Sequence, residues 1–376
     1  VRDECLLRCF PMRESVNRSA LTARKIVPSK NHQRLRADMY LNRRSECLKD
    51  WMEILALGMS RSWLWGPAMW QSSAFFAKLV GDEPGFLLES VEHGERWSRF
   101  SFVGRHPRAT LELIDGELRV TGDIPASVPR DQGMLAAIEA LVLEYRSPVI
   151  PDLPPLQGGV MGFLGYDIVR EVESLPNTPH DDRHLPDGVM SVIGSLAAFD
   201  HWRQRVYLIE SVPVVALNAQ PLSVNELDVL YDEAALRALR AVEDLARPLP
   251  YTPVEPPQRD DVLPTAISSM PNGAYQRAVE VAKEYIKAGD IFQVVLSQRY
   301  ELQLEADPFD MYRVLRQVNP SPYMYFLRHP GVTIVGSSPE PMVQLLGGRV
   351  ISRPIAGTRK RGTNDEHDRR LAAELR

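Results

Sequence analysis

From residue 73 to about residue 207, hydrophobic and polar residues are arranged in short runs separated by turns, which predicts a region of strands. Asp115-Gly116, between two such runs, is a strong hairpin signal. Residues 133–145 instead have the apolar spacing of an amphipathic helix. The expected strands cover residues 85–90, 97–103, 110–114, 117–120, 158–164, 189–200 and 205–211.

The pattern changes further along the chain. Residues 227–245, rich in Ala, Leu and Glu, predict a helix, and the six prolines of residues 248–265 predict a linker. A helix over 273–288 is expected to stop at Gly289, and Asp307-Pro308 is expected to begin another. Strands are expected over residues 291–304, 323–328, 333–336, 342–346 and 349–353. Strands joined by hairpins and broken by helices indicate an α+β fold of mixed sheets flanked by helices.

Length and composition exclude several classes of protein. A chain of 376 residues suggests two or three domains, and a net charge of −5 argues against a general nucleic-acid binder. No apolar run is long enough to cross a membrane. The three cysteines, Cys5, Cys9 and Cys47, fit neither a disulfide framework nor a closed metal site, so a cytoplasmic location is the default expectation.

Residues 1–70 differ from the rest of the chain. They hold 13 Lys/Arg and 7 Asp/Glu, all three cysteines and four of the six tryptophans, without sustained periodicity. An organelle transit peptide, an extra domain and an out-of-frame or fragmentary translation are three readings of this segment. The last is favoured, and the segment is expected to pack poorly on the remainder.

Six short motifs follow one another between residues 87 and 359. They are Leu-Leu-Glu-Ser (87–90), Gly-Phe-Leu-Gly-Tyr-Asp (162–167), Ala-Gly-Asp-Ile-Phe-Gln-Val-Val-Leu-Ser-Gln-Arg (288–299), Asn-Pro-Ser-Pro-Tyr-Met-Tyr (319–325), Gly-Ser-Ser-Pro-Glu (336–340) and Pro-Ile-Ala-Gly-Thr-Arg (354–359). In this order they resemble the large subunits of anthranilate synthase, which belong to the chorismate-using enzymes. The resemblance runs from about residue 72 to Arg376.

The resemblance implies a domain organisation. Residues 71–247 would form the N-terminal domain of the family, residues 248–268 a proline-rich linker, and residues 269–376 the first part of the chorismate-binding domain. Family members continue beyond the position of Arg376, so the fold is expected to be incomplete at its C-terminus and the chain to be inactive alone.

Two positions separate the chorismate-using enzymes by their nucleophile. Relatives that add water have a lysine at the position of Gln293, because water needs a base. Ammonia is already nucleophilic, so the amide of Gln293 indicates ammonia. Aminodeoxychorismate synthases have a lysine at the position of Ala356 that forms a covalent adduct, which alanine cannot form. The pair therefore favours anthranilate synthase.

The resemblance assigns the substrate residues as well. Glu340 matches the general acid, which must protonate the C4 hydroxyl of chorismate because hydroxide is a poor leaving group. Gly357 and Thr358 match the chorismate-binding pair, where glycine permits close backbone approach and the threonine hydroxyl can bind oxygen.

A second site is implied for the inhibitor L-tryptophan. Ser90 and residues Pro322, Tyr323 and Met324 match this site, although 232 residues separate Ser90 from Pro322. A ligand held between two parts of a chain can couple them, and the resemblance implies feedback inhibition.

Other parts of the machinery are expected elsewhere. The resemblance places the glutamate ligands of Mg²⁺ beyond Arg376, so this chain is expected to hold no metal ligand of the reaction. Residues 365–368 are acidic, but we interpret them as a solvated connecting segment. A separate glutamine amidotransferase subunit would supply the ammonia; nucleic acid and membrane are not expected partners.

Two alternatives to a lyase that makes anthranilate for tryptophan biosynthesis stay open. One is aminodeoxychorismate synthase, which aminates a different ring carbon. The other is a tryptophan-binding regulatory remnant without catalysis.

Overall fold

The computed structural model describes the backbone of residues 37–41 and 52–60, and residues 72–91, 99–147, 150–213, 222–252, 254–258, 260–262, 264–354 and 357–375. The chain divides into two compact units. The first comprises the described residues before position 253 together with residues 319–376, and the second is Val254–Val318. The domain assignment made from the sequence stays a prediction.

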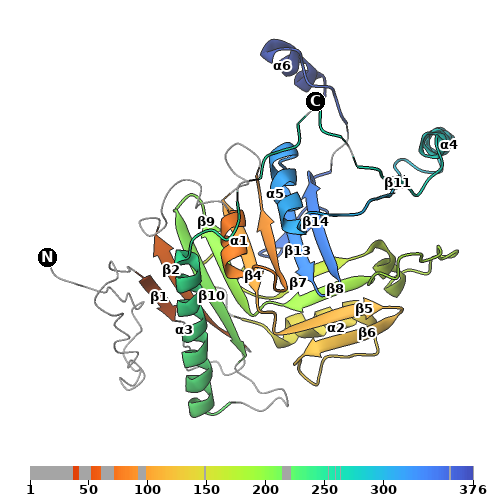
Figure 1. Ribbon diagram of the computed structural model, residues 1–376. Coiled ribbons are helices and arrows are strands. Elements are labelled where there is room, and N and C mark those ends of the chain that lie inside the picture. The colour runs from red at the N-terminus through yellow and green to blue at the C-terminus, as the bar shows by residue number, and fades with distance from the viewer. Residues whose placement is uncertain are drawn as a thin grey trace. The chain divides into compact units, whose positions relative to one another are not determined.

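The first unit contains an eight-stranded antiparallel sheet (Figure 1). From edge to edge its strands are β1 (Ala37–Leu41), β2 (Met52–Ser60), β10 (Arg205–Pro213), β9 (Ser195–Asp200), β4 (Phe100–Arg105), β3 (Gly85–Glu89), β13 (Tyr323–His329) and β14 (Val332–Ser338). β13 therefore joins the early strand β3 to a hairpin formed much later in the chain.

Strand β2 lies within residues 1–70. It pairs with β10 over nine residue pairs, from Met52↔Pro213 to Ser60↔Arg205. A ladder of backbone hydrogen bonds joins a strand to its neighbour. The expectation that residues 1–70 pack poorly on the remainder stays a prediction. Most of the remaining residues of this segment, including the three cysteines, lie outside the described residues.

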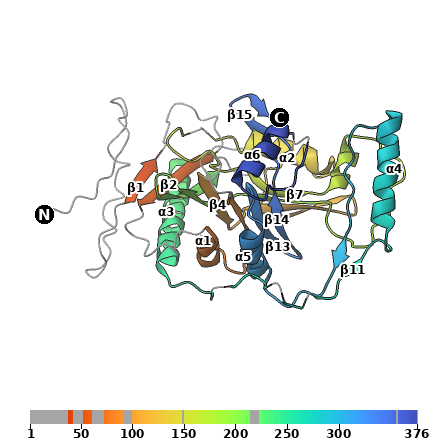
Figure 2. The ribbon, with the colours of Figure 1, turned by 90° about the horizontal axis from the view of Figure 1, so that it is seen from above.

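Helices α1 (Ser72–Leu79) and α3 (Val224–Ala246) lie side by side on one face of this sheet (Figures 1 and 2). Ser223 and Glu226 form a capping box that begins α3. The buried positions of α3 are Ala234, Ala238, Ala241 and Leu245. Small side chains let the helix lie close to the sheet, where Arg237 donates to the buried Glu210 of β10 at 2.9 Å.

A second, four-stranded sheet has the order β6 (Glu117–Gly122), β5 (Ala109–Ile114), β8 (Gly188–Val192), β7 (Val160–Leu164). The predicted hairpin at Asp115-Gly116 is confirmed, with both residues at positive φ. The predicted helix over 133–145 is α2 (Gly133–Glu144), which buries Met134, Ala137 and Leu141 against this sheet. The carboxylate of Glu171 accepts the N–H groups of Met134 and Leu135 at 2.7 and 2.8 Å and so caps α2.

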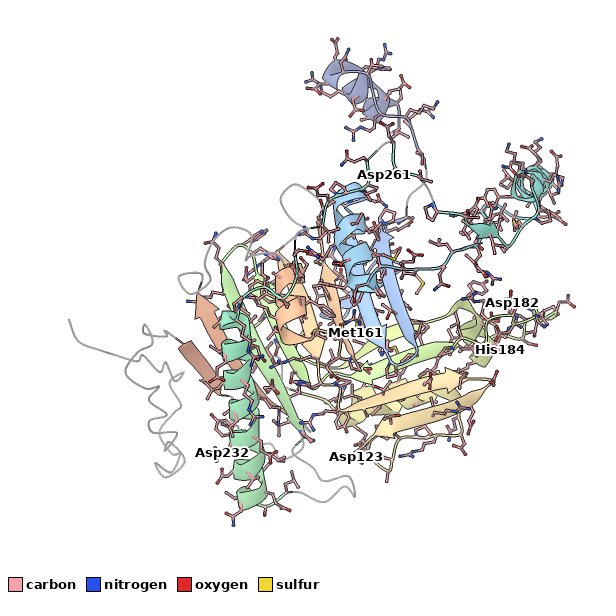
Figure 3. All side chains as sticks on the ribbon, viewed as in Figure 1. Asp123, Met161, Asp182, His184, Asp232 and Asp261 are labelled. Atoms are coloured by element: carbon pink, nitrogen blue, oxygen red, sulfur yellow. The ribbon has the colours of Figure 1, made fainter. Side chains whose placement is uncertain are left out.

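One hydrophobic cluster of this unit lies between the two sheets. Phe86, Ile209 and Leu327 of the large sheet pack with Met161 and Phe163 of β7 (Figure 3 labels Met161). β7 is an edge strand in which residues 160–163 are half-buried and Leu164 is exposed. Hydrophobic side chains from both sheets meet in one layer, which is the main apolar contact between them.

The single strand predicted over residues 189–200 is wrong, because the structure has two strands there, in different sheets. β8 ends at Val192 in the small sheet and β9 begins at Ser195 in the large one. Between them, a Cβ on Gly194 would lie 2.2 Å from the carbonyl oxygen of His106. The missing side chain therefore allows the chain to cross from one sheet to the other.

The second unit contains α4 (Ala274–Ala288), α5 (Pro308–Val318) and the short pair β11 (Ile267–Ser268) and β12 (Tyr300–Glu301). Gly289 ends α4 at φ 84°, and α5 begins at Pro308, as predicted. The long strand predicted over residues 291–304 is wrong. Of these residues, only Tyr300 and Glu301 pair with another strand in the described part of the chain. Phe292 and Val295 are 94% and 85% exposed, since no neighbouring strand covers them there.

The last elements are short. β15 (Gln344–Leu346) and β16 (Arg349–Ile351) form the predicted hairpin around Gly347-Gly348, both at positive φ. Helix α6 (Asp365–Glu374) follows. The α+β class with sheets flanked by helices is therefore confirmed for the described residues, and the strand pairs of the two larger sheets are antiparallel.

Candidate functional site

The sheet brings together the two parts of the predicted tryptophan site. β3 and β13 are neighbours, with Glu89 opposite Met324, and the N–H of Val91 donates to the carbonyl of Ser321 at 3.1 Å. Ser90 and Tyr323 are each the next residue beyond the Glu89–Met324 pair. Strand pairing thus places residues that are more than 230 positions apart in the chain at one place in the sheet.

The hydroxyl of Ser90 is buried and lacks a hydrogen-bond partner among the described residues. Leaving a buried hydroxyl without a partner costs about 1–3 kcal/mol, so such atoms commonly face a ligand or an ordered water. This oxygen suits a polar group of a small ligand.

The residues of β13 divide between the two faces of the sheet. Met324 is 1% exposed and shares a face with Phe326, whose ring meets Phe76 of α1 edge-on at 5.1 Å. Tyr323 and Tyr325 alternate with them, and Tyr325 packs with Leu88 against the core between the sheets. Met324 is therefore on the face of the sheet opposite to Tyr323 and Ser90.

Glu340 follows β14 and is exposed. The Ser338 hydroxyl donates to the carbonyl oxygen of Glu340 at 3.2 Å and lies 3.5 Å from the Glu340 nitrogen. A carboxyl group that donates a proton near neutral pH usually sits in an apolar, buried place. The described residues hold the backbone of Glu340 without providing that environment.

The other substrate residues predicted from the sequence are also exposed. Gly357 and Thr358 lie between β16 and α6, and a Cβ on Gly357 would meet the side chain of Leu375 at 3.3 Å. Ala356 lies outside the described residues. Gln293 belongs to the second unit, in the stretch between α4 and β12.

One group of side chains in the described residues could hold a metal ion. Oxygen and nitrogen atoms of Asp115, Asp181 and His184 lie within 4.8 Å of one another, and all three residues are exposed. His184 lies in the exposed loop that follows η4 (Tyr166–Glu171) (Figure 3). Mg²⁺ prefers an all-oxygen octahedral shell, and Asp181 already accepts the N–H groups of Arg183 and His184 at 3.0 Å. This group does not fit the magnesium expected from the resemblance.

The acidic residues 365–368 take part in local structure. They form the first turn of α6 rather than the connecting segment that the sequence suggests, and Asn364 caps this helix by accepting the His367 N–H at 2.9 Å. Asp368 accepts the Gly362 N–H at 2.7 Å, and this hydrogen bond lowers the pKa of the Asp368 carboxyl. These bonds give the residues a structural role in the first turn of α6.

Polar residues between the two sheets escaped the sequence analysis. Thr110 and Ser191 are joined by a hydrogen bond of 3.1 Å, and Ser191 lies 3.5 Å from Nδ1 of His329. Burial lowers the pKa of His329. A void of about 20 Å³ beside His329 has room for about one water molecule. Only strand alternation could have indicated that His329 of β13 faces the core.

None of the helices in the described ranges has the length and apolar character needed to cross a lipid bilayer.

The comparisons with known proteins agree with one another. The profile of a family described as chorismate binding enzyme matches residues 84–376. "Anthranilate synthase component 1" of Thermus thermophilus is 42% identical over 303 residues, covering 80% of this chain and 60% of that protein. The protein of the same name from Arthrobacter globiformis is 37% identical over 309 residues, covering 80% of this chain and 57% of that protein.

A solved structure gives the same result for the fold. The crystal structure of anthranilate synthase component I from Streptococcus pneumoniae is similar with a TM-score of 0.56 and 28% identity, over 76% of this chain and 58% of that one. The chain thus spans somewhat under two thirds of the length of the relatives it matches.

Proposed function

The chain belongs to the chorismate binding enzymes, and we propose that within this family it is part of the large subunit of an anthranilate synthase, a lyase. The complete protein would convert chorismate and ammonia into anthranilate, pyruvate and water. Relatives named component 1 support this choice over the other reactions of the family.

Gln293 is the residue that carries the choice of nucleophile. Its amide can position ammonia but cannot act as a base toward water. Glu340 would then protonate the departing C4 hydroxyl, while Gly357 and Thr358 hold the substrate. The exposure of these residues in the described part of the chain means that their chemistry depends on a more enclosed environment than the one seen here.

The regulatory part of the proposal has its own support. The buried, unpartnered hydroxyl of Ser90 beside Tyr323 fits a polar group of L-tryptophan. This observation also favours the second candidate, a tryptophan-binding protein without catalysis. A ligand that holds β3 and β13 in one arrangement can inhibit by favouring that state.

Calorimetry and an activity assay together test the proposal. Tryptophan binding without chorismate binding, in the chain extended at Arg376 by the remaining sequence of the Thermus thermophilus relative, would favour the second candidate. Ammonia-dependent anthranilate fluorescence from the extended chain would support the first. A product aminated at another ring carbon would indicate aminodeoxychorismate synthase, and Ala356→Lys in the extended chain probes that difference.

Partners and cofactor complete the proposal. A glutamine amidotransferase subunit would supply ammonia from glutamine, so that glutamate is the second product. Magnesium and a cytoplasmic location stay predictions, and the described residues include no group that fits the magnesium ion.

A further inference from the structure

Ser90, Tyr323 and Ser338 lie at neighbouring positions on the three adjacent strands β3, β13 and β14, and so form one row of side chains across the sheet. Tyr323 of β13 is directly opposite Ser338 of β14, and Ser90 and Tyr323 both follow the Glu89–Met324 pair. Neighbouring strands are about 4.8 Å apart, so a row over three strands spans about 10 Å. This length suits a ligand of the size of an aromatic amino acid.

The row has polar ends and an aromatic centre. The Ser90 hydroxyl is buried without a partner at one end, and Tyr323 lies between it and Ser338. In the next row, the ring of Tyr325 lies over Gly336, where a Cβ would be 2.0 Å from Cζ of the tyrosine. Because Gly336 has no side chain, the aromatic ring of Tyr325 can lie over it, beside the row that contains Ser90, Tyr323 and Ser338.

The Ser338 hydroxyl is held only loosely by its own turn. It donates to the Glu340 carbonyl oxygen over 3.2 Å and accepts the Glu340 N–H over 3.5 Å. Hydrogen bonds of this length are weak, so a ligand group can compete for the hydroxyl. The adjacent Ser337 points to the opposite face and donates to the Asn319 carbonyl at 2.8 Å.

We infer that Ser338 is a binding residue for the aromatic amino acid that occupies the Ser90 site. This inference rests on the proposed tryptophan site. Binding draws the Ser338 hydroxyl from the Glu340 backbone toward the ligand, so that one side chain serves both the ligand site and the turn that carries the proposed general acid. Ser338 thereby acts on Glu340 as a positioning residue.

The test uses the full chain, L-tryptophan as probe, and two neighbouring serines. A lost neutral hydrogen bond is worth about threefold to tenfold in affinity, so Ser338→Ala is expected to weaken tryptophan binding by that factor in calorimetry. Ser338→Thr keeps the hydroxyl and is expected to restore the affinity to within about twofold. Ser337→Ala, which removes a hydroxyl from the opposite face, is the matched control and is expected to leave affinity unchanged.

A second measurement follows the Glu340 turn itself. Amide hydrogen exchange at Glu340 is expected to become faster when tryptophan binds the unaltered chain, and to be independent of tryptophan in Ser338→Ala. Equal affinities for the two alanine variants would overturn the role of Ser338 but not the Ser90 site. A Glu340 amide that exchanges at the same rate with and without tryptophan would do the same. Failure of the unaltered chain to bind tryptophan would overturn the Ser90 site as well.

Discussion

The Ser90 region and the residues predicted to act on chorismate differ in how the structure holds them. Ser90 and Tyr323 are placed by the backbone pairing of β3 with β13, next to a packed core. Gln293, Glu340, Gly357 and Thr358 are exposed, and none of them lies within a strand or helix. A site built on strand register is fixed once the sheet forms, whereas residues on connecting segments need other groups to enclose them.

The largest expected difference between the two regions is that the Ser90 region binds its ligand while the chorismate residues support no turnover. We expect the chain by itself to form no anthranilate from chorismate, ammonium and Mg²⁺ while still binding tryptophan. Loss of one preorganised donor can cost a hundredfold or more in rate, and the exposed substrate residues lack several. Anthranilate fluorescence followed over time is the measurement, and robust turnover would contradict the distinction between the two regions.

The role of Gln293 can be examined in the extended chain. Gln293→Lys is expected to lower ammonia-dependent anthranilate formation by about a hundredfold, because a charged side chain replaces the amide that positions ammonia. Addition of water to chorismate is the expected side reaction, detectable by chromatography. Gln303→Lys, at an exposed position of the same unit between β12 and α5, is the control. Equal rates for the two variants would remove Gln293 from the site.

The packing of Tyr325 on Gly336, next to the Ser90 region, is expected to have a smaller effect, which is on stability. Gly336→Ala would force a methyl group into the ring of Tyr325 and is expected to reduce the free energy of unfolding by about 1–3 kcal/mol. Gly347→Ala, in the exposed turn at φ 57°, meets no atom within 4 Å. It is expected to cost about 1 kcal/mol, from backbone strain only. Urea unfolding of both variants tests the difference; a reversed order would mean that Tyr325 does not pack on Gly336.

The smallest effect concerns pH and the core next to β13. Because burial lowers the pKa of His329, the unfolded chain takes up a proton at a higher pH than the folded one. Stability is therefore expected to fall as the pH drops below the ordinary histidine value of about 6.5, by at most about 1.4 kcal/mol per pH unit. Below the folded pKa the loss is complete.

The groups around His329 make this test specific. Ser191 is neutral, and Arg105, the charged residue lining the adjacent void, is directed to the Leu79 carbonyl and to Asp244. His329→Gln is expected to reduce the pH dependence of the urea midpoint without abolishing it, because burial also lowers the pKa of His106. His180→Gln, at an exposed position, is expected to leave the pH dependence unchanged. A flat profile in the unaltered chain would show that His329 is not held neutral by folding.

Local signals in the sequence predicted much of the fold. Gly289 ends α4 and Asp115-Gly116 forms a hairpin, because each depends on the backbone preferences of one or two residues. The strand predicted over 189–200 was wrong because the crossing at Gly194 depends on a contact with His106, far away in the sequence. The strand predicted over 291–304 was wrong because a strand needs a neighbour to pair with, and an alternating sequence pattern does not show whether that neighbour is present.

The candidate site shows the same limit. The motif resemblance, confirmed by the family profile over residues 84–376, indicated Ser90 and Tyr323 together. Neither periodicity nor composition indicated that Ser338 shares their row, because that depends on the register of β13 with β14. The burial of Met324 also follows from which face of β13 meets α1, which the sequence leaves open.

The pairing of β3 with β13 has a consequence for synthesis on the ribosome. Glu89 emerges long before its partner Met324, and translation adds about 5–20 residues per second, so β3 waits roughly 10 to 50 seconds for its neighbour. During that time one edge of β3 stays open to other strands. A nascent chain stalled before residue 323 would have Ser90 without Tyr323, so the proposed tryptophan site would be complete only after the hairpin of β13 and β14 has left the exit tunnel.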